Sequence, residues 1–155
     1  MLEALSRAIA DTSASAYIAD NLWITPAVQS VHILAIAALS GSVLMICLRL
    51  MGRTADIALS VVDRRFSPWI WWPALFLLLS GIVLVVGEPD RELMNILFRL
   101  KMLLVIVLLA LVALFQRRLR GNPDAWRGVS GGLLGLGMAL LWVAIVSAGR
   151  WIAYI

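Results

Sequence analysis

Residues 27–48 read AVQSVHILAIAALSGSVLMICL, a run of 22 residues without a charged side chain. A helix of that length rises about 33 Å, which is enough to cross a hydrocarbon core about 30 Å thick. The run contains His32, which is the only histidine of the chain. Counted from Pro26, His32 lies roughly 9 Å below one membrane surface. Because an imidazole is costly to place inside a bilayer, the stretch predicts both a membrane span and a functional site.

The composition of the whole chain agrees with this prediction. Of the 155 residues, 63% are hydrophobic and 14% are charged, whereas soluble domains average about 45–50% and about 25%. The length fits one integral membrane domain over residues 1–155. The single cysteine, Cys47, excludes an intrachain disulfide and a CxxC metal motif. Sequence motifs of hydrolases and nucleotide-binding proteins, such as GxSxG, HExxH and the P-loop, are also absent.

Three further apolar stretches follow along the chain, and the third span is unusual. Its uncharged part, from Met102 to Gln116, has only 15 residues, short of the roughly 20 that a span needs. The helix must therefore include Arg99 and Lys101. The sequence thus predicts an all-α bundle of four transmembrane helices, with spans at about residues 26–48, 69–87, 97–116 and 129–149.

Two segments outside the spans predict helices that lie in the membrane interface. Residues 1–22 carry apolar side chains at helical spacing among polar ones, and residues 52–66 are too charged to cross but offer one apolar face. Trp69, Trp71 and Trp72 form an interfacial aromatic cluster at the start of the second span. Before the third span, Asp90 is the expected helix cap.

The basic residues predict the orientation of the chain. Eight of the thirteen lie in the two loops 49–67 and 117–130, together with three acidic residues. The positive-inside rule then predicts that both loops lie in the cytoplasm and both termini on the opposite side of the membrane. We therefore attribute the excess of basic residues to the orientation of the chain in the lipid bilayer. It does not predict a nucleic-acid partner.

Four polar groups are expected at one depth, one from each span. They are His32, Glu88, Lys101 and Arg150, and Lys101 is the only lysine beside twelve arginines. Simpler interpretations are that the basic side chains snorkel to the headgroups, that Glu88 is solvated or pairs with Lys101, and that His32 hydrogen-bonds a neighbouring helix.

A haem b or porphyrin site in the outer half of the bundle is the first functional hypothesis. His32 is the expected axial ligand, and Ala35 on the same helical face leaves room for a flat group. Arg99, Lys101 and Arg150 are expected near the propionates, with Lys101 also a possible second ligand.

Two alternatives stay open. The first is copper binding or transport, with His32 and Met102 as ligands. The second is a structural membrane subunit without cofactor, in which glycine pairs of the fourth span, Gly128 with Gly132 and Gly131 with Gly135, allow close helix packing. A homo-oligomer or membership of a larger membrane complex is expected in either case. The sequence leaves open whether the protein is an enzyme, and it identifies no catalytic residue.

The chain resembles a family of small four-helix bacterial inner-membrane proteins of unknown function. The resemblance extends from Trp23 to the closing Gly149-Arg150-Trp151 segment and includes Pro68-Trp69 and Ser80-Gly81. It implies a bacterial inner membrane, with both termini in the periplasm. The regions from His32 to Leu50 and from Leu100 to Leu104 also resemble the membrane-type protoporphyrinogen oxidase and copper-resistance protein D. The resemblance to the oxidase implies haem b as cofactor and functional roles for His32 and Lys101.

Overall fold

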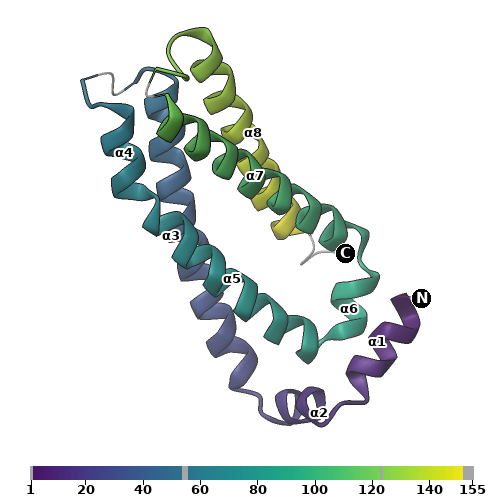
Figure 1. Cartoon of the computed structure of the whole chain (residues 1–155). Coiled ribbons are helices and arrows are strands. Elements are labelled where there is room, and N and C mark those ends of the chain that lie inside the picture. The colour runs from purple at the N-terminus through teal and green to yellow at the C-terminus, as the bar shows by residue number, and fades with distance from the viewer. Residues whose placement is uncertain (1, 54–55, 123, 152–155) are drawn as a thin grey trace.

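The computed structural model describes residues 2–53, 56–122 and 124–151, and these residues form helices and connecting turns without any strand (Figure 1). Four helices, counting the α4–α5 pair as one, are long and apolar enough to cross a membrane. The predicted all-α, multi-pass membrane fold is confirmed. The helices are α1 (Leu2–Ala10), α2 (Ser13–Asp20), α3 (Ile24–Leu50), α4 (Leu59–Phe66), α5 (Pro68–Gly87), α6 (Pro89–Met94), α7 (Ile96–Gly121) and α8 (Val129–Trp151).

The third span, α7, includes Arg99 and Lys101, as its short uncharged run required. It also continues beyond Gln116 to Gly121, since the arginines of its last turns can extend toward the headgroups while the backbone stays helical. The side chain of Asn95 caps its first turn by accepting the Leu97 N–H at 2.9 Å. Asp90, the expected cap, instead accepts a hydrogen bond from the Ser6 hydroxyl.

The charged segment before the second span is helical only over α4, and α4 runs on into α5 (Figure 1). Ser67 joins the two helices in an α-helical conformation, with φ −54° and ψ −45°. Its N–H donates to the Asp63 carbonyl at 2.7 Å, which continues the helical pattern. The expected separate surface helix is therefore an extension of the second span.

Most of the buried core lies in one half of the bundle. We call this the closed half, which contains residues 39–50, 59–73, 108–121 and 129–142. Ile145 is the one member of the described core cluster that lies outside it. Helix α3 packs against α5 and α8, and α7 packs against α8. The side chains that fill the core come from all of these helices, and they include Val43, Ile46, Ile70, Leu108, Val112, Phe115 and Met138.

Two glycines of α8 allow its close approach to α3. A Cβ atom on Gly135 would lie 2.9 Å from both the Cys47 carbonyl oxygen and the Leu50 Cβ. A Cβ on Gly131 would overlap the Trp126 carbonyl oxygen and lie 3.6 Å from a Leu50 methyl group. The Gly131–Gly135 pair is thus used inside the chain, whereas a Cβ on Gly128 or Gly132 would meet no described atom within 4 Å.

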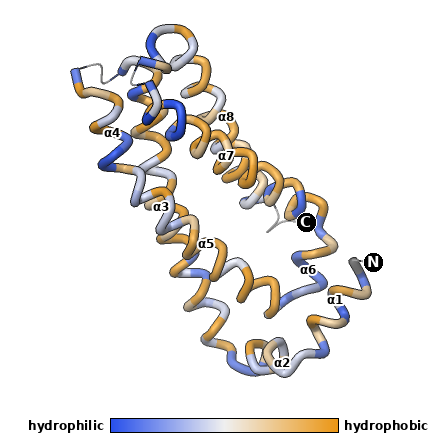
Figure 2. Tube along the Cα trace, viewed as in Figure 1, coloured by the Kyte–Doolittle hydropathy of each residue, from blue (hydrophilic) through white to orange (hydrophobic). Residues whose placement is uncertain are grey.

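The other half, which we call the open half, contains residues 24–38, 74–87, 96–107 and 143–151. Here α5 and α7 diverge, and α1, α2 and α6 lie across the end of the bundle where both termini are found (Figure 1). Helix α1 contacts α6, and α2 contacts α5. Figure 2 shows that hydrophilic residues gather toward the two ends of the molecule, while the long helices between them are mainly hydrophobic.

Candidate functional site

The histidine in the first span contacts the second span in the open half. The Nδ1 atom of His32 lies 2.7 Å from the Ser80 Oγ. The Ser80 hydroxyl also lies 2.6 Å from the Phe76 carbonyl oxygen, one turn earlier on α5, and donates its proton there. With its one proton on the Phe76 carbonyl, the Ser80 oxygen is placed to accept from His32 Nδ1–H, which is the tautomer in which Nε2 keeps its lone pair.

Small residues surround the imidazole ring. A Cβ atom on Gly81 would lie 3.9 Å from His32 Cε1, at ordinary van der Waals distance, so Gly81 lies directly beside the ring. Ala35, which shares the helical face of His32, is buried with 7% of its surface exposed. The ring itself is half-buried. The position of Ala35 agrees with the expectation of limited side-chain bulk beside His32.

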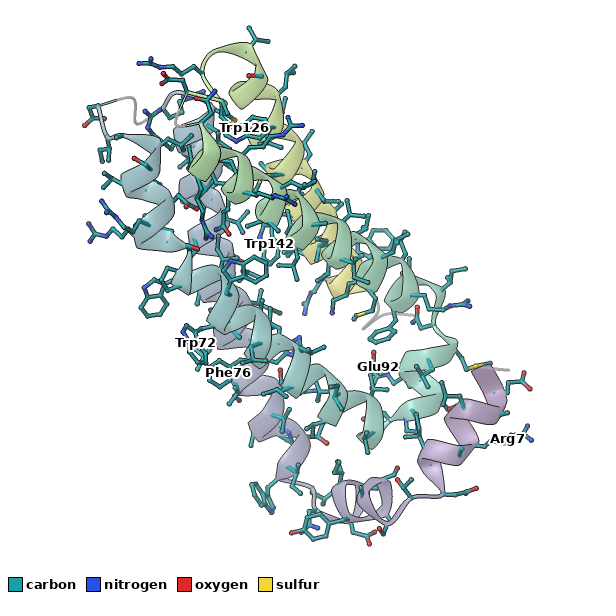
Figure 3. The ribbon with its side chains drawn as sticks, viewed as in Figure 1. Arg7, Trp72, Phe76, Glu92, Trp126 and Trp142 are labelled. Atoms are coloured by element: carbon teal, nitrogen blue, oxygen red, sulfur yellow. The ribbon has the colours of Figure 1, made fainter. Side chains whose placement is uncertain are left out.

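Lys101 lies in the same half and is half-buried against α8. Its Cε and Nζ atoms are each 3.6 Å from the position that a Cβ on Gly149 would take. The charge of Lys101 acts on the imidazole of His32, and Lys101 in turn interacts with the charge of Glu92 on α6. Glu92 points into the region between α5 and α7 (Figure 3). Lys101 is therefore near enough to act electrostatically on both His32 and Glu92, and the common depth of His32 and Lys101 stays a prediction.

The other residues predicted to bind a cofactor or metal, Arg99, Arg150 and Met102, are more exposed than His32 and Lys101. Arg99 and Arg150 are both exposed, and Arg150 directly follows the glycine against which Lys101 packs. Met102 is 38% exposed, and as the residue after Lys101 it lies about 100° further around α7. The described residues contain no group of three or more His, Cys, Asp or Glu side chains that could hold a metal ion.

Glu88 has a different partner from the one considered in the sequence. Its carboxylate lies 2.8 Å from Arg91 Nη1, and both side chains are about half-exposed. This hydrogen bond raises the pKa of the Arg91 guanidinium. The carboxylate whose charge acts on Lys101 is that of Glu92, four residues further along the chain.

A second polar cluster, which the sequence did not predict, lies in the closed half. The amide nitrogen of Gln116 donates to Asp63 Oδ1 at 3.1 Å and to Ser67 Oγ at 3.0 Å. Its amide oxygen accepts from Trp71 Nε1 at 3.0 Å. Both Asp63 and Gln116 are buried, with 8% and 3% of their surfaces exposed.

One feature of the sequence could have indicated this cluster. Asp63, Ser67 and Trp71 are spaced four residues apart, so they share one face of any helix that runs through all three. A separate surface helix over residues 52–66 would not place these three side chains on one face. Because α4 continues into α5, they do share a face, and Gln116 is buried against it.

The comparisons with known proteins point to one family. Residues 8–155 match the profile of a family of unknown function, DUF6644. The chain has no match among curated proteins and none among solved structures. The resemblances to protoporphyrinogen oxidase and copper-resistance protein D therefore gain no support from these comparisons. Since the profile covers nearly the whole sequence, the chain belongs to the DUF6644 family of unknown function.

Proposed function

We propose that the open half of the bundle binds a haem b or a related porphyrin, with His32 as the axial ligand. The observation that carries this proposal is the 2.7 Å contact of His32 Nδ1 with a Ser80 hydroxyl that itself donates to the Phe76 carbonyl. Histidine ligands of metals commonly donate their second ring N–H to a protein acceptor, which fixes the tautomer and orients the ring. Ser80 provides that acceptor, and Nε2 is left with the lone pair that a ligand needs.

The surroundings of His32 fit a large apolar ring with acidic substituents. The open half presents apolar side chains that the rest of the chain leaves exposed, among them Ile82 at 52% and Leu103 at 58%. Lys101 supplies a positive charge near the imidazole, as a partner for a propionate or as a second ligand. Haem held there would supply one-electron or oxygen chemistry, while Glu92 would orient the ammonium group of Lys101.

The orientation of the site in the membrane is a further part of the proposal. If the basic loops face the cytoplasm, as the positive-inside rule favours, His32 and Lys101 lie in the periplasmic half of the bilayer. The protein would then hold its cofactor on the side of the membrane where both termini lie.

The absorption spectrum of the purified protein tests the proposal directly. The protein is produced in cells given a haem precursor and is also titrated with haemin in detergent. We expect a Soret band, and we expect His32→Ala to remove it. Ser80→Ala should weaken haem binding by about 10–100-fold, because the imidazole loses the partner that orients it.

Matched controls separate ligation from general damage to the helices. Gln29→Ala changes an exposed residue on the same helix as His32, and Ser40→Ala removes a hydroxyl that bonds only the Ile36 carbonyl. Both variants should keep the Soret band and its haem affinity. A wild-type protein that shows no Soret band after both treatments, or a His32→Ala variant that binds haemin as well as wild type, would overturn the proposal.

A further inference from the structure

A groove in the closed half lies where α4, α5 and α7 meet. It has a volume of about 450 Å³, within the roughly 300–1,000 Å³ of sites for small ligands. The polar side chains that line it are Ser60, Asp63, Arg64, Ser67 and Arg120. The groove is separate from the site around His32, since none of its lining residues belongs to the open half.

The groove combines both signs of charge over a short distance. Asp63 lies at its base, and among the described residues only its Oδ1 atom accepts a hydrogen bond, from Gln116. The charge of Arg120 acts on Asp63, and Arg64, the residue next to Asp63, is exposed beside it. A lining that holds one carboxylate and two guanidinium groups matches a zwitterionic ligand that has a phosphate next to an ammonium group.

The aromatic residues beside the groove indicate its depth in the membrane. Trp69 and Trp72, in the first turns of α5, are 61% and 63% exposed. Trp71, which is 41% exposed, donates to the same Gln116 that bonds Asp63. Exposed tryptophans at the end of an apolar span mark the headgroup level of the bilayer. The groove therefore opens at the depth where lipid headgroups lie.

We propose that this groove binds the headgroup of phosphatidylethanolamine. The guanidinium groups of Arg64 and Arg120 contact the phosphate, and the carboxylate of Asp63 accepts hydrogen bonds from the primary ammonium group. The hydroxyls of Ser60 and Ser67 lie in the same groove and contribute further polar contacts. A quaternary ammonium group cannot donate to Asp63, and a glycerol headgroup brings no positive charge to it. The groove therefore favours phosphatidylethanolamine over phosphatidylcholine and phosphatidylglycerol with the same acyl chains.

Native mass spectrometry of the delipidated full chain in detergent tests this proposal. The protein is mixed with equal amounts of the three lipids, and the bound lipids are counted. We expect about tenfold more phosphatidylethanolamine than phosphatidylcholine, which is the effect of one charge-assisted hydrogen bond. Asp63→Asn keeps an acceptor for Gln116 and should abolish this preference. Arg120→Gln should weaken the binding of all three lipids.

Two controls and one competitor make the result specific. Asp124→Asn and Arg117→Gln change exposed charges of the same end of the molecule that do not line this groove, and both should retain the preference. Soluble glycerophosphoethanolamine in excess should compete with the lipid, because the headgroup carries the recognition. Equal binding of the three lipids by wild type, stronger binding of phosphatidylglycerol, or an unchanged preference in a helical Asp63→Asn variant would each overturn the proposal.

Discussion

The closed and open halves of this bundle are built from the same four long helices, yet they use their polar residues differently. In the closed half, Gln116 connects three side chains from α4 and α5 within a buried core. In the open half, His32 contacts Ser80, and the helices diverge. Every residue of the described hydrophobic core cluster except Ile145 belongs to the closed half. The comparison indicates that the closed half holds the fold together.

The largest effect that this comparison predicts comes from the core of the closed half. Phe115 is fully buried beside Trp126, and their ring centroids are 6.2 Å apart. Phe115→Ala should leave a cavity and lower the free energy of unfolding by about 3 kcal/mol. Unfolding in a denaturing detergent, followed by circular dichroism, measures the loss. Phe76→Ala is the matched change on α5, and because Phe76 is 50% exposed it should have a small effect. Equal losses for the two variants would refute the division into halves.

An intermediate effect is expected for the amide that connects the polar cluster of the closed half. Gln116→Leu keeps a similar volume but leaves Asp63 Oδ1 and Trp71 Nε1 without their partner. Unsatisfied buried polar groups of this kind should cost about 2 kcal/mol in the same unfolding assay. Gln29→Leu, at an exposed position of the open half, should change stability by less than about 0.5 kcal/mol. A Gln116→Leu variant as stable as wild type would show that the cluster contributes no stability.

The smallest effect is expected at the start of α7 in the open half. Asn95→Ala removes the side-chain cap on the Leu97 N–H and should cost about 1 kcal/mol. Because few contacts hold this end of α7, hydrogen exchange should increase in its first turn and remain unchanged near Phe115. Asn95→Ser should restore protection, since serine caps equally well. An increase in exchange that reaches the closed half would mean that the two halves unfold together.

Much of the fold could be predicted because membrane spans depend on local sequence. Four uncharged runs gave four spanning helices, and the shortness of the third run correctly placed Arg99 and Lys101 inside α7. The continuity of α4 with α5 could not be predicted from the sequence. It depends on the helical conformation of Ser67, and a charged segment before a proline is equally compatible with a helix that ends there.

For the candidate site, the sequence predicts depth but not direction. Counting residues from the membrane surface placed His32 and Lys101 at similar heights, but depth does not determine which face of a helix points inward. Arg99 is two residues before Lys101 and so lies about 200° around α7, where it is exposed. The contact of Ser80 with His32 could not be predicted, because a serine in an apolar span has no distinctive sequence pattern until its partner on another helix is known.

The helices α1, α2 and α6 have a consequence for how a molecule could arrive at His32. They lie across the end of the bundle, and the hydrogen bond from Ser6 to Asp90 connects α1 to α6. A solute from the aqueous side meets this layer first, whereas a compound dissolved among the acyl chains can diffuse laterally toward the region where α5 and α7 separate. The supply of such a compound to the protein is then governed by its partition coefficient into the bilayer, and its concentration in water matters only through that coefficient.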